Sequence, residues 1–321
     1  MLLRLKSDSM RLLLAVICVV FSGFLQADEP VQINRGDLSL HGTLLTAEQS
    51  RHLLILHPGS GPTDRHGNQP GMPNNALGLL ATALNEAGFA VLSYDKRGVG
   101  ESVSTQPEAD LRPSHYIDDL VAWIDWARAN HPKQGVVVIG HSEGALFAKA
   151  AGLQRPDEVS AVVALAGAGR PIGELLVEQT QGRLPGPLEG EFHRILDELL
   201  AGRTVDEVSA PLASLFRPSV QPYLIEWLAM NPAEIAEILT APLLVVSGST
   251  DLQVSRADFD MLSRFAQRQA WLDGMNHVLK VSEGPIEAQL SSYLSPEGPL
   301  HPDLVPAVMA FLQSLGESAR D

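Results

Sequence analysis

The chain has 321 residues, of which 45% are hydrophobic and 19% are charged, and its formal net charge is −15. This length allows one large α/β domain or two small ones, and the composition is that of a globular protein with a buried core rather than a disordered chain. Because a strongly acidic chain repels phosphate backbones and anionic lipids, the charge argues against a nucleic-acid-binding protein.

The first 27 residues have the order of a secretory signal peptide. Arg4, Lys6 and Arg11 precede an apolar run, Leu12–Leu25, and the small residue Ala27 follows it. This order predicts cleavage after residue 27 and export to the periplasm or out of the cell. The run is shorter than the roughly 20 residues that cross a bilayer, so we expect no stable membrane insertion after cleavage. An uncleaved N-terminal anchor is the alternative.

The only cysteine, Cys18, lies inside this predicted signal. The remainder, residues 28–321, can therefore form no disulfide, and it must be stabilised by its hydrophobic core, which a chain of that length can build. We interpret residues 28–321 as one domain.

From residue 28 onward, short apolar segments alternate with longer segments of helical periodicity. This alternation is typical of the α/β class, with a mostly parallel sheet and helices on both faces. The expected strands, of which the first two form a hairpin, are Val31–Ile33, Leu38–Leu45, Leu53–Leu56, Phe89–Tyr94, Val136–Ile139, Val159–Leu165, Leu243–Val246 and Gln269–Leu272. The expected helices that flank the sheet are Ala76–Ala87, Tyr116–Ala129, Ala145–Leu153 and Leu304–Leu315.

Between Gly169 and Pro242 the strand signal disappears. Leu188–Leu200 and Tyr223–Leu239 carry apolar residues at helical spacing, and several prolines interrupt the segment. We interpret residues 170–241 as a helical cap inserted over one end of the sheet, not as an independent domain.

The most informative motif is G-x-S-x-G, which lies between a buried strand and a helix with Ser142 at its centre. In this setting the serine occupies a sharp, strained turn that exposes its hydroxyl, and Gly140 and Gly144 let neighbouring backbone pass close by. The helix N-terminus brings a backbone N–H and a partial positive charge to the place where an oxyanion develops. The motif predicts that Ser142 is a nucleophile. A turn of small residues without a chemical role is the alternative.

A serine hydroxyl needs a base, and the base needs an acid that orients it. With the nucleophile on a strand–turn–helix, the acid and then the histidine follow later in the chain. Asp251 comes shortly after the expected strand Leu243–Val246, and His277 follows Gln269–Leu272. Both then lie at the sheet edge that carries Ser142, where open α/β sheets bind ligands.

Three other residues compete for these roles. Asp273 is too close to His277 in sequence to come from the preceding strand loop. The side chain of His141 is expected to point away from the neighbouring hydroxyl at a tight turn. His301 precedes a proline at the start of the last helix. Asp251 and His277 are therefore favoured.

An oxyanion also needs a second N–H donor, which comes from the loop after the third strand. This loop contains Gly59 and Gly61, which permit inward-facing N–H groups. We favour the N–H of Ser60, with that of Gly61 as the alternative, alongside the N–H of Glu143. The side chain of Glu143 is expected at the surface or against the cap.

Two further clusters receive a structural interpretation. His57, Asp64 and His66 share one loop but lack regular ligand spacing, so we expect no metal. The charges of Asp95–Gly98, which follow a strand, are expected to brace neighbouring loops. Binding of a substrate carboxylate by Arg97 is the alternative.

Together these residues resemble the α/β-hydrolase superfamily, and more narrowly its bacterial serine esterases of the dienelactone-hydrolase-like and cinnamoyl-esterase-like kind. The segments that carry the resemblance are Gly59–Asn68, Tyr94–Ser102, Gly140–Gly144, Asp251–Val254 and Asn276–His277. The resemblance implies an eight-stranded sheet with a helical cap and a Ser–Asp–His carboxylesterase. His57 and Pro58 stand where the superfamily often has His-Gly, which bears on the identity of the oxyanion donor.

We therefore expect a serine esterase that acts on small to medium acyl esters through an acyl-enzyme, with a small-molecule ester as its partner and no cofactor. A thioesterase or peptidase with the same three residues, and a non-catalytic binding protein of this fold, are the alternatives.

Overall fold

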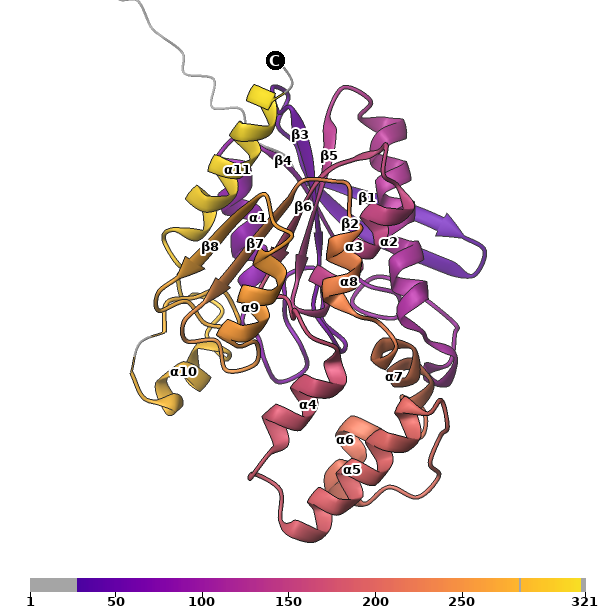
Figure 1. The fold of residues 1–321 in the computed structure, drawn as a ribbon. Coiled ribbons are helices and arrows are strands. Elements are labelled where there is room, and N and C mark those ends of the chain that lie inside the picture. The colour runs from indigo at the N-terminus through magenta and orange to yellow at the C-terminus, as the bar shows by residue number, and fades with distance from the viewer. Residues whose placement is uncertain (1–27, 283, 319–321) are drawn as a thin grey trace, which may run out of the picture.

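The computed structural model of the protein describes residues 28–282 and 284–318 (Figure 1). The predicted signal peptide, residues 1–27, lies outside the described residues. The described strands form one eight-stranded sheet in the order β1-β2-β4-β3-β5-β6-β7-β8. They are β1 Asp28–Arg35, β2 Leu38–Leu45, β3 His52–His57, β4 Ala90–Tyr94, β5 Gly135–His141, β6 Val159–Leu165, β7 Leu243–Gly248 and β8 Arg268–Leu272.

The sheet is mostly parallel. β1 pairs with β2 and β2 with β4 in antiparallel fashion, and every pair from β4 to β8 is parallel. This arrangement confirms the fold class predicted from the sequence, an α/β protein with a mostly parallel eight-stranded sheet.

Helices cover both faces of the sheet, as the apolar runs of its central strands require. In β5, Val136 and Val138 belong to one apolar cluster while Val137 and Ile139 belong to the other, because successive side chains point to opposite faces. The first cluster is covered by α2 (Pro113–Asn130), α3 (Glu143–Gln154) and α9 (Arg256–Ser263). The second is covered by α1 (Ala76–Glu86) and α11 (Leu304–Ser318), which lie side by side in Figure 1.

Five helices lie between β6 and β7, and in Figure 1 α4 to α7 extend beyond the sheet. They are α4 Ile172–Thr180, α5 Gly186–Leu200, α6 Ala213–Phe216, α7 Gln221–Leu228 and α8 Pro232–Glu237. Their own apolar cluster includes the fully buried Phe192, Ile195 and Phe216. We refer to α4–α8 as the insertion helices. The remaining short elements are η2 Ala210–Leu212, within the same insertion, and, outside it, η1 Glu108–Asp110 and α10 Ile286–Ser292.

One of the prolines that interrupt the insertion begins a helix. The run Tyr223–Leu239 forms two helices rather than one, because Pro232 has no N–H to continue α7 and instead begins α8. The side chain of Asn231 caps this start by accepting hydrogen bonds from the N–H groups of Ala233 and Glu234. Within residues 28–318, residue 283 excepted, the helices are all too short or too polar to cross a bilayer.

Candidate active site

Ser142 lies at the turn between β5 and α3, with a backbone φ of 56° and ψ of −121°. A non-glycine residue in this conformation is strained by about 1–3 kcal/mol, and surrounding contacts must hold it there. The N–H of Ser142 donates to the carbonyl of Leu165 on β6 at 2.9 Å, and its own carbonyl accepts from the N–H of Ala145 at 3.0 Å. The hydroxyl is thereby presented beyond the end of β5.

The two glycines of the motif have no room for a side chain. A β-carbon on Gly140 would lie 2.0 Å from the carbonyl oxygen of Gly144. A β-carbon on Gly144 would lie 2.5 Å from the carbonyl oxygen of Pro58. The tight turn itself explains the glycine at 140, and the close approach of the loop after β3 explains the glycine at 144.

His277 and Asp251 meet Ser142 at this edge of the sheet. Nε2 of His277 lies 3.1 Å from Oγ of Ser142, and Nδ1 of His277 lies 2.9 Å from Oδ2 of Asp251. The side chain of Asp251 is fully buried, and that of His277 is 5% exposed. The structure thus brings the three residues predicted from the sequence into one hydrogen-bonded line.

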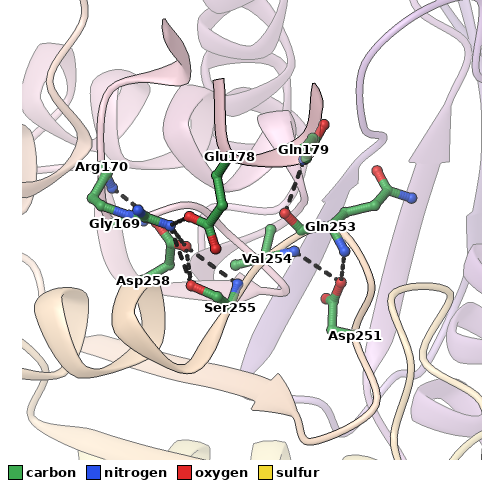
Figure 2. Close-up of polar contacts among 9 residues, drawn as sticks. All are labelled: Gly169, Arg170, Glu178, Gln179, Asp251, Gln253, Val254, Ser255 and Asp258. Carbon is green, nitrogen blue, oxygen red and sulfur yellow. Dashed lines mark hydrogen bonds and ion pairs between the residues drawn. The ribbon is translucent and has the colours of Figure 1, made fainter. Parts of the chain in front are cut away.

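The second oxygen of Asp251 is held by backbone. Its Oδ1 accepts from the N–H of Gln253 at 2.7 Å and from the N–H of Val254 at 2.9 Å (Figure 2). The carbonyl of Gln253 in turn accepts from the side-chain amide of Gln179, on the insertion helix α4, at 3.0 Å. Asp251 is therefore fixed in orientation by a loop that also contacts α4.

The three competing residues make other contacts. His141 donates through Nε2 to the carbonyl of His277 at 2.7 Å, and burial, followed by the neighbouring charge of His277, lowers the pKa of His141 to about 4. Asp273 accepts from the hydroxyl of Ser249 at 2.7 Å, and His301 donates through Nε2 to the carbonyl of Asp273 at 3.0 Å. His141 is therefore a neutral group that helps to fix the backbone of His277.

Ser60 and Glu143 lie on either side of Ser142 and line the same cavity. In the described part of the chain, neither the N–H of Ser60 nor that of Glu143 has an acceptor. Gly59 lies close enough to Ser142 that a β-carbon there would be 3.2 Å from that of the serine. Both groups predicted as oxyanion donors are therefore near the serine, and neither N–H is occupied.

The side chain of Glu143 is not at the surface. It is 5% exposed, and its carboxylate accepts from the hydroxyl of Tyr223, on the insertion helix α7, at 2.7 Å. Burial raises the pKa of Glu143, against the opposing effects of Lys96 and of the hydrogen bond from Tyr223. Of the two sequence expectations, contact with the inserted helices is the one found.

Two cavities meet at Ser142 and His277. One, of about 190 Å³, lies against the insertion helices and is lined mainly by apolar side chains, which are Leu146, Ile172, Leu175, Leu176, Leu215, Trp227, Pro232 and Val254. We call it the apolar cavity. The other, of about 210 Å³, is lined by more polar groups, including Thr63, Gln69, Asn74, Gln253 and Tyr293. We call it the polar cavity.

An ion-pair cluster joins the first insertion helix to α9 (Figure 2). Arg170 binds Asp258 through Nη2 at 2.8 Å and through Nε at 3.1 Å, and it binds Glu178 at 2.6 Å. Burial favours the neutral form of Asp258, but hydrogen bonds from Arg170 and Ser255 hold the pKa of its carboxyl below the ordinary value. The sequence analysis missed this cluster, because Arg170 and Asp258 lie 88 residues apart and follow no motif.

The charged turn after β4 braces its surroundings. Arg97 donates to both carboxylate oxygens of Asp119 at 2.7 and 2.6 Å and to the carbonyl of His115. His57 shares a buried hydrogen bond with the hydroxyl of Tyr94. The described residues contain no group of three or more His, Cys, Asp or Glu side chains placed to hold a metal ion.

The sheet order, the strained serine after β5 and the Ser–His–Asp contacts define an α/β-hydrolase fold with its site at the carboxyl edge of the parallel strands. Residues 74–270 match the protein family described as serine aminopeptidase, S33. The chain belongs to this family, and the resemblance to the α/β-hydrolase superfamily is confirmed.

Individual relatives agree with this assignment. Esterase EstD of Thermotoga maritima is 26% identical over 252 residues, which cover 73% of this chain and 57% of EstD, so the chain spans just over half of that relative. Est1E from Butyrivibrio proteoclasticus is similar in structure, with a TM-score of 0.59, 18% identity and coverage of 90% of this chain and 99% of that one. The esterase Pf2001 of Pyrococcus furiosus has a TM-score of 0.57, 20% identity and coverage of 91% and 92%. At these identities the two structures show the fold alone.

Proposed function

We propose that this chain is a serine hydrolase that cleaves carboxylic esters, with Ser142 as the nucleophile, His277 as the base and Asp251 as the acid that orients it. The observation that carries the proposal is the line of contacts from Ser142 Oγ to His277 Nε2 and from His277 Nδ1 to Asp251. With Asp251 ionised, Nδ1 carries the proton, and Nε2 is left as the acceptor that a general base requires.

The reaction follows from this arrangement. Ser142 Oγ attacks the acyl carbon while His277 Nε2 takes the hydroxyl proton, which gives a tetrahedral oxyanion and an imidazolium stabilised by Asp251. The imidazolium then protonates the leaving alcohol, and the acyl-enzyme forms. Water, deprotonated by the same Nε2, attacks the acyl-enzyme, and the imidazolium returns this proton to Ser142 Oγ as the carboxylic acid is released. No step needs a cofactor.

The N–H groups of Ser60 and Glu143 would bind the oxyanion. Donors fixed in advance toward developing charge cost no reorganisation during the reaction, and removing one such donor elsewhere costs about 10²- to 10³-fold in kcat. Both N–H groups lack an acceptor in the described residues, which supports the assignment.

The two cavities favour an ester whose acyl part is apolar and whose alcohol part is more polar. The apolar cavity offers leucine, isoleucine and tryptophan side chains, and its volume of about 190 Å³ suits an acyl chain of small to medium length. The polar cavity offers hydroxyl and amide groups to an alcohol or its substituents. The sequence relative EstD is named an esterase, which supports ester hydrolysis over other acyl transfers.

Peptide or thioester cleavage is the alternative within the same chemistry, and the family description names an aminopeptidase. A direct test compares the hydrolysis of p-nitrophenyl esters of two to ten carbons, aminoacyl p-nitroanilides and an acyl thioester by the purified protein. We expect ester turnover that Ser142→Ala abolishes. Turnover of the anilides alone would replace the proposal with a peptidase, and absence of all turnover would favour a binding protein.

Export through residues 1–27 is also a proposal, and it rests on the sequence alone. Amino-terminal sequencing of the protein recovered from its native host would test it, with a start near residue 28 expected. A start at Met1 would contradict export with cleavage.

A further inference from the structure

Lys96 is a buried lysine that holds the loop carrying Ser60. Lys96 comes shortly after β4 in the chain, and it is only 3% exposed. Its Nζ donates to the carbonyl of Gly59 at 2.5 Å and to the carbonyl of Gly61 at 2.7 Å. One cation therefore binds the backbone on both sides of Ser60.

The contact between Lys96 and the carbonyl of Gly59 also fixes the direction of the N–H of Ser60. The carbonyl of Gly59 and the N–H of Ser60 belong to the same peptide, and the described residues contain no cis peptide bond. In a trans peptide the C=O and N–H vectors point in opposite directions. Because Lys96 draws the Gly59 carbonyl to its own side, the N–H of Ser60 must point away from Lys96.

The remaining carbonyl of this loop is held as well. The carbonyl of Ser60 accepts from the hydroxyl of Thr63 at 2.7 Å and from the side-chain amide of Gln69 at 3.0 Å. Three successive carbonyls thus have donors, while the N–H of Ser60 has no acceptor in the described part of the chain. A backbone whose carbonyls all have donors and which keeps an open N–H is prepared to bind an anion.

The carboxylate of Glu143 and the ring of Tyr116 lie near the amine of Lys96. Burial lowers the pKa of Lys96 to about 8, and the carboxylate of Glu143 opposes this by favouring the charged amine. The ring of Tyr116 lies with its centroid 5.4 Å from Nζ and adds a cation–π contact. Glu143, which supplies the other open N–H, is itself bound by Tyr223. The amine that orders one donor therefore lies near the carboxyl group of the residue that carries the other.

We propose that Lys96 is a positioning residue for the oxyanion hole, which fixes the N–H of Ser60 in the direction that the reaction needs. This inference rests on the proposed function, because it assigns Lys96 a role in stabilising the same oxyanion. A lysine that merely fills space in the core would affect stability without affecting the transition state selectively.

Lys96→Met tests the proposal, because it keeps much of the side-chain length and removes the donors. Lys149→Met is the matched control, since Lys149 on α3 is also fully buried and its Nζ has no hydrogen-bond partner among the described groups. In Lys96→Met we expect kcat for a p-nitrophenyl ester to fall about 10²-fold, with KM changed less than threefold. Lys149→Met is expected to stay within twofold of the wild type in both constants.

The labelling rate with a fluorophosphonate is the second measurement, because its phosphonyl oxygen needs the same donors whatever ester the protein prefers. We expect this rate to fall by a similar factor in Lys96→Met. Thermal unfolding checks that each variant folds, and Lys96→Gln, which retains a shorter donor, replaces Lys96→Met if that variant does not fold.

A folded Lys96 variant with wild-type kcat and labelling rate would overturn the proposal, as would an equal loss in Lys149→Met. Wild-type protein that is labelled but cleaves no ester would contradict the proposed function, and the ratio of labelling rates would still decide the role of Lys96. Wild-type protein that is neither labelled nor active would overturn both.

Discussion

Nε2 of His277 lies 3.1 Å from Oγ of Ser142, although 135 residues separate them in the chain. The two reach each other because β5 and β8 run parallel within one sheet, so the loops that follow them lie at the same edge. The side chain of His277 is only 5% exposed, which strengthens its electrostatic interactions relative to water.

Asp251→Asn should lower kcat by about 10⁴-fold, because an amide permits the wrong imidazole tautomer and cannot stabilise the imidazolium. Asp273→Asn is the matched control, since Asp273 lies near His277 in sequence but contacts Ser249 instead. Ester turnover at saturating substrate is the measurement. A larger loss of kcat in Asp273→Asn than in Asp251→Asn would show that Asp251 is not the residue that orients His277.

The apolar cavity should set the acyl-chain preference. Leu176→Phe adds bulk to a half-buried wall of this cavity, so we expect the ratio of kcat/KM for an eight-carbon to a two-carbon ester to fall about tenfold. Met72→Phe, at the rim of the polar cavity, should leave that ratio within twofold of the wild type. Equal ratios in all three proteins would show that the acyl chain lies elsewhere.

Arg170→Ala should destabilise the protein by about 3 kcal/mol, because it leaves the fully buried carboxylate of Asp258 without its cation. Glu178→Gln removes the other partner, whose side chain is 51% exposed, and should cost less than about 1 kcal/mol. The free energies of unfolding from urea titrations test both. Similar losses of unfolding free energy in the two variants would contradict the claim that Asp258, and not Glu178, depends on Arg170 (Figure 2).

Lys149 should make stability depend on pH. Burial lowers its pKa from 10.5 to about 7, so above that pH the folded chain holds a neutral amine while the unfolded chain still binds a proton. The stability of the wild type relative to Lys149→Met should therefore rise by about 1.4 kcal/mol per pH unit between pH 7 and 10, and should be constant below pH 7. Urea unfolding at several pH values measures the difference, and a difference independent of pH would refute the expectation.

Tyr223→Phe should weaken the link between the insertion helices and the site. It removes the hydroxyl that donates to the buried carboxylate of Glu143, so we expect a loss of about 1–3 kcal/mol in the free energy of unfolding. The edge-to-face contact of its ring with Tyr116, at 5.9 Å, is retained in the variant. Tyr116→Phe provides a control that also loses one phenolic hydroxyl. Unchanged stability in Tyr223→Phe would mean that water replaces the lost donor.

Much of the fold could be predicted because the sheet imposes a simple pattern on the sequence. β2 and β6 begin and end where the apolar segments Leu38–Leu45 and Val159–Leu165 do. The α9 and α10 helices were missed, since both are short and α9 carries several charged residues. Pro232 explains why the run Tyr223–Leu239 forms two helices, because a proline is accommodated at the start of a helix and not in its middle.

The positions of Ser142, Asp251 and His277 could be expected from the sequence, because each follows a recognisable strand. The contacts of Lys96, Arg170 and Tyr223 could not, since they depend on how loops and inserted helices fold back onto the site. Lys96 lies in a turn whose charges were interpreted as structural, and only the coordinates show that its amine binds the Ser60 loop rather than a carboxylate.

The central claim is that Ser142 is an activated nucleophile. Its most direct test is to treat the folded protein with a fluorophosphonate and to locate the adduct by mass spectrometry of peptides. The account predicts one adduct, on Ser142, and no labelling of Ser142→Ala. An adduct on another residue, equal labelling of the variant, or no labelling of the folded wild type would contradict it.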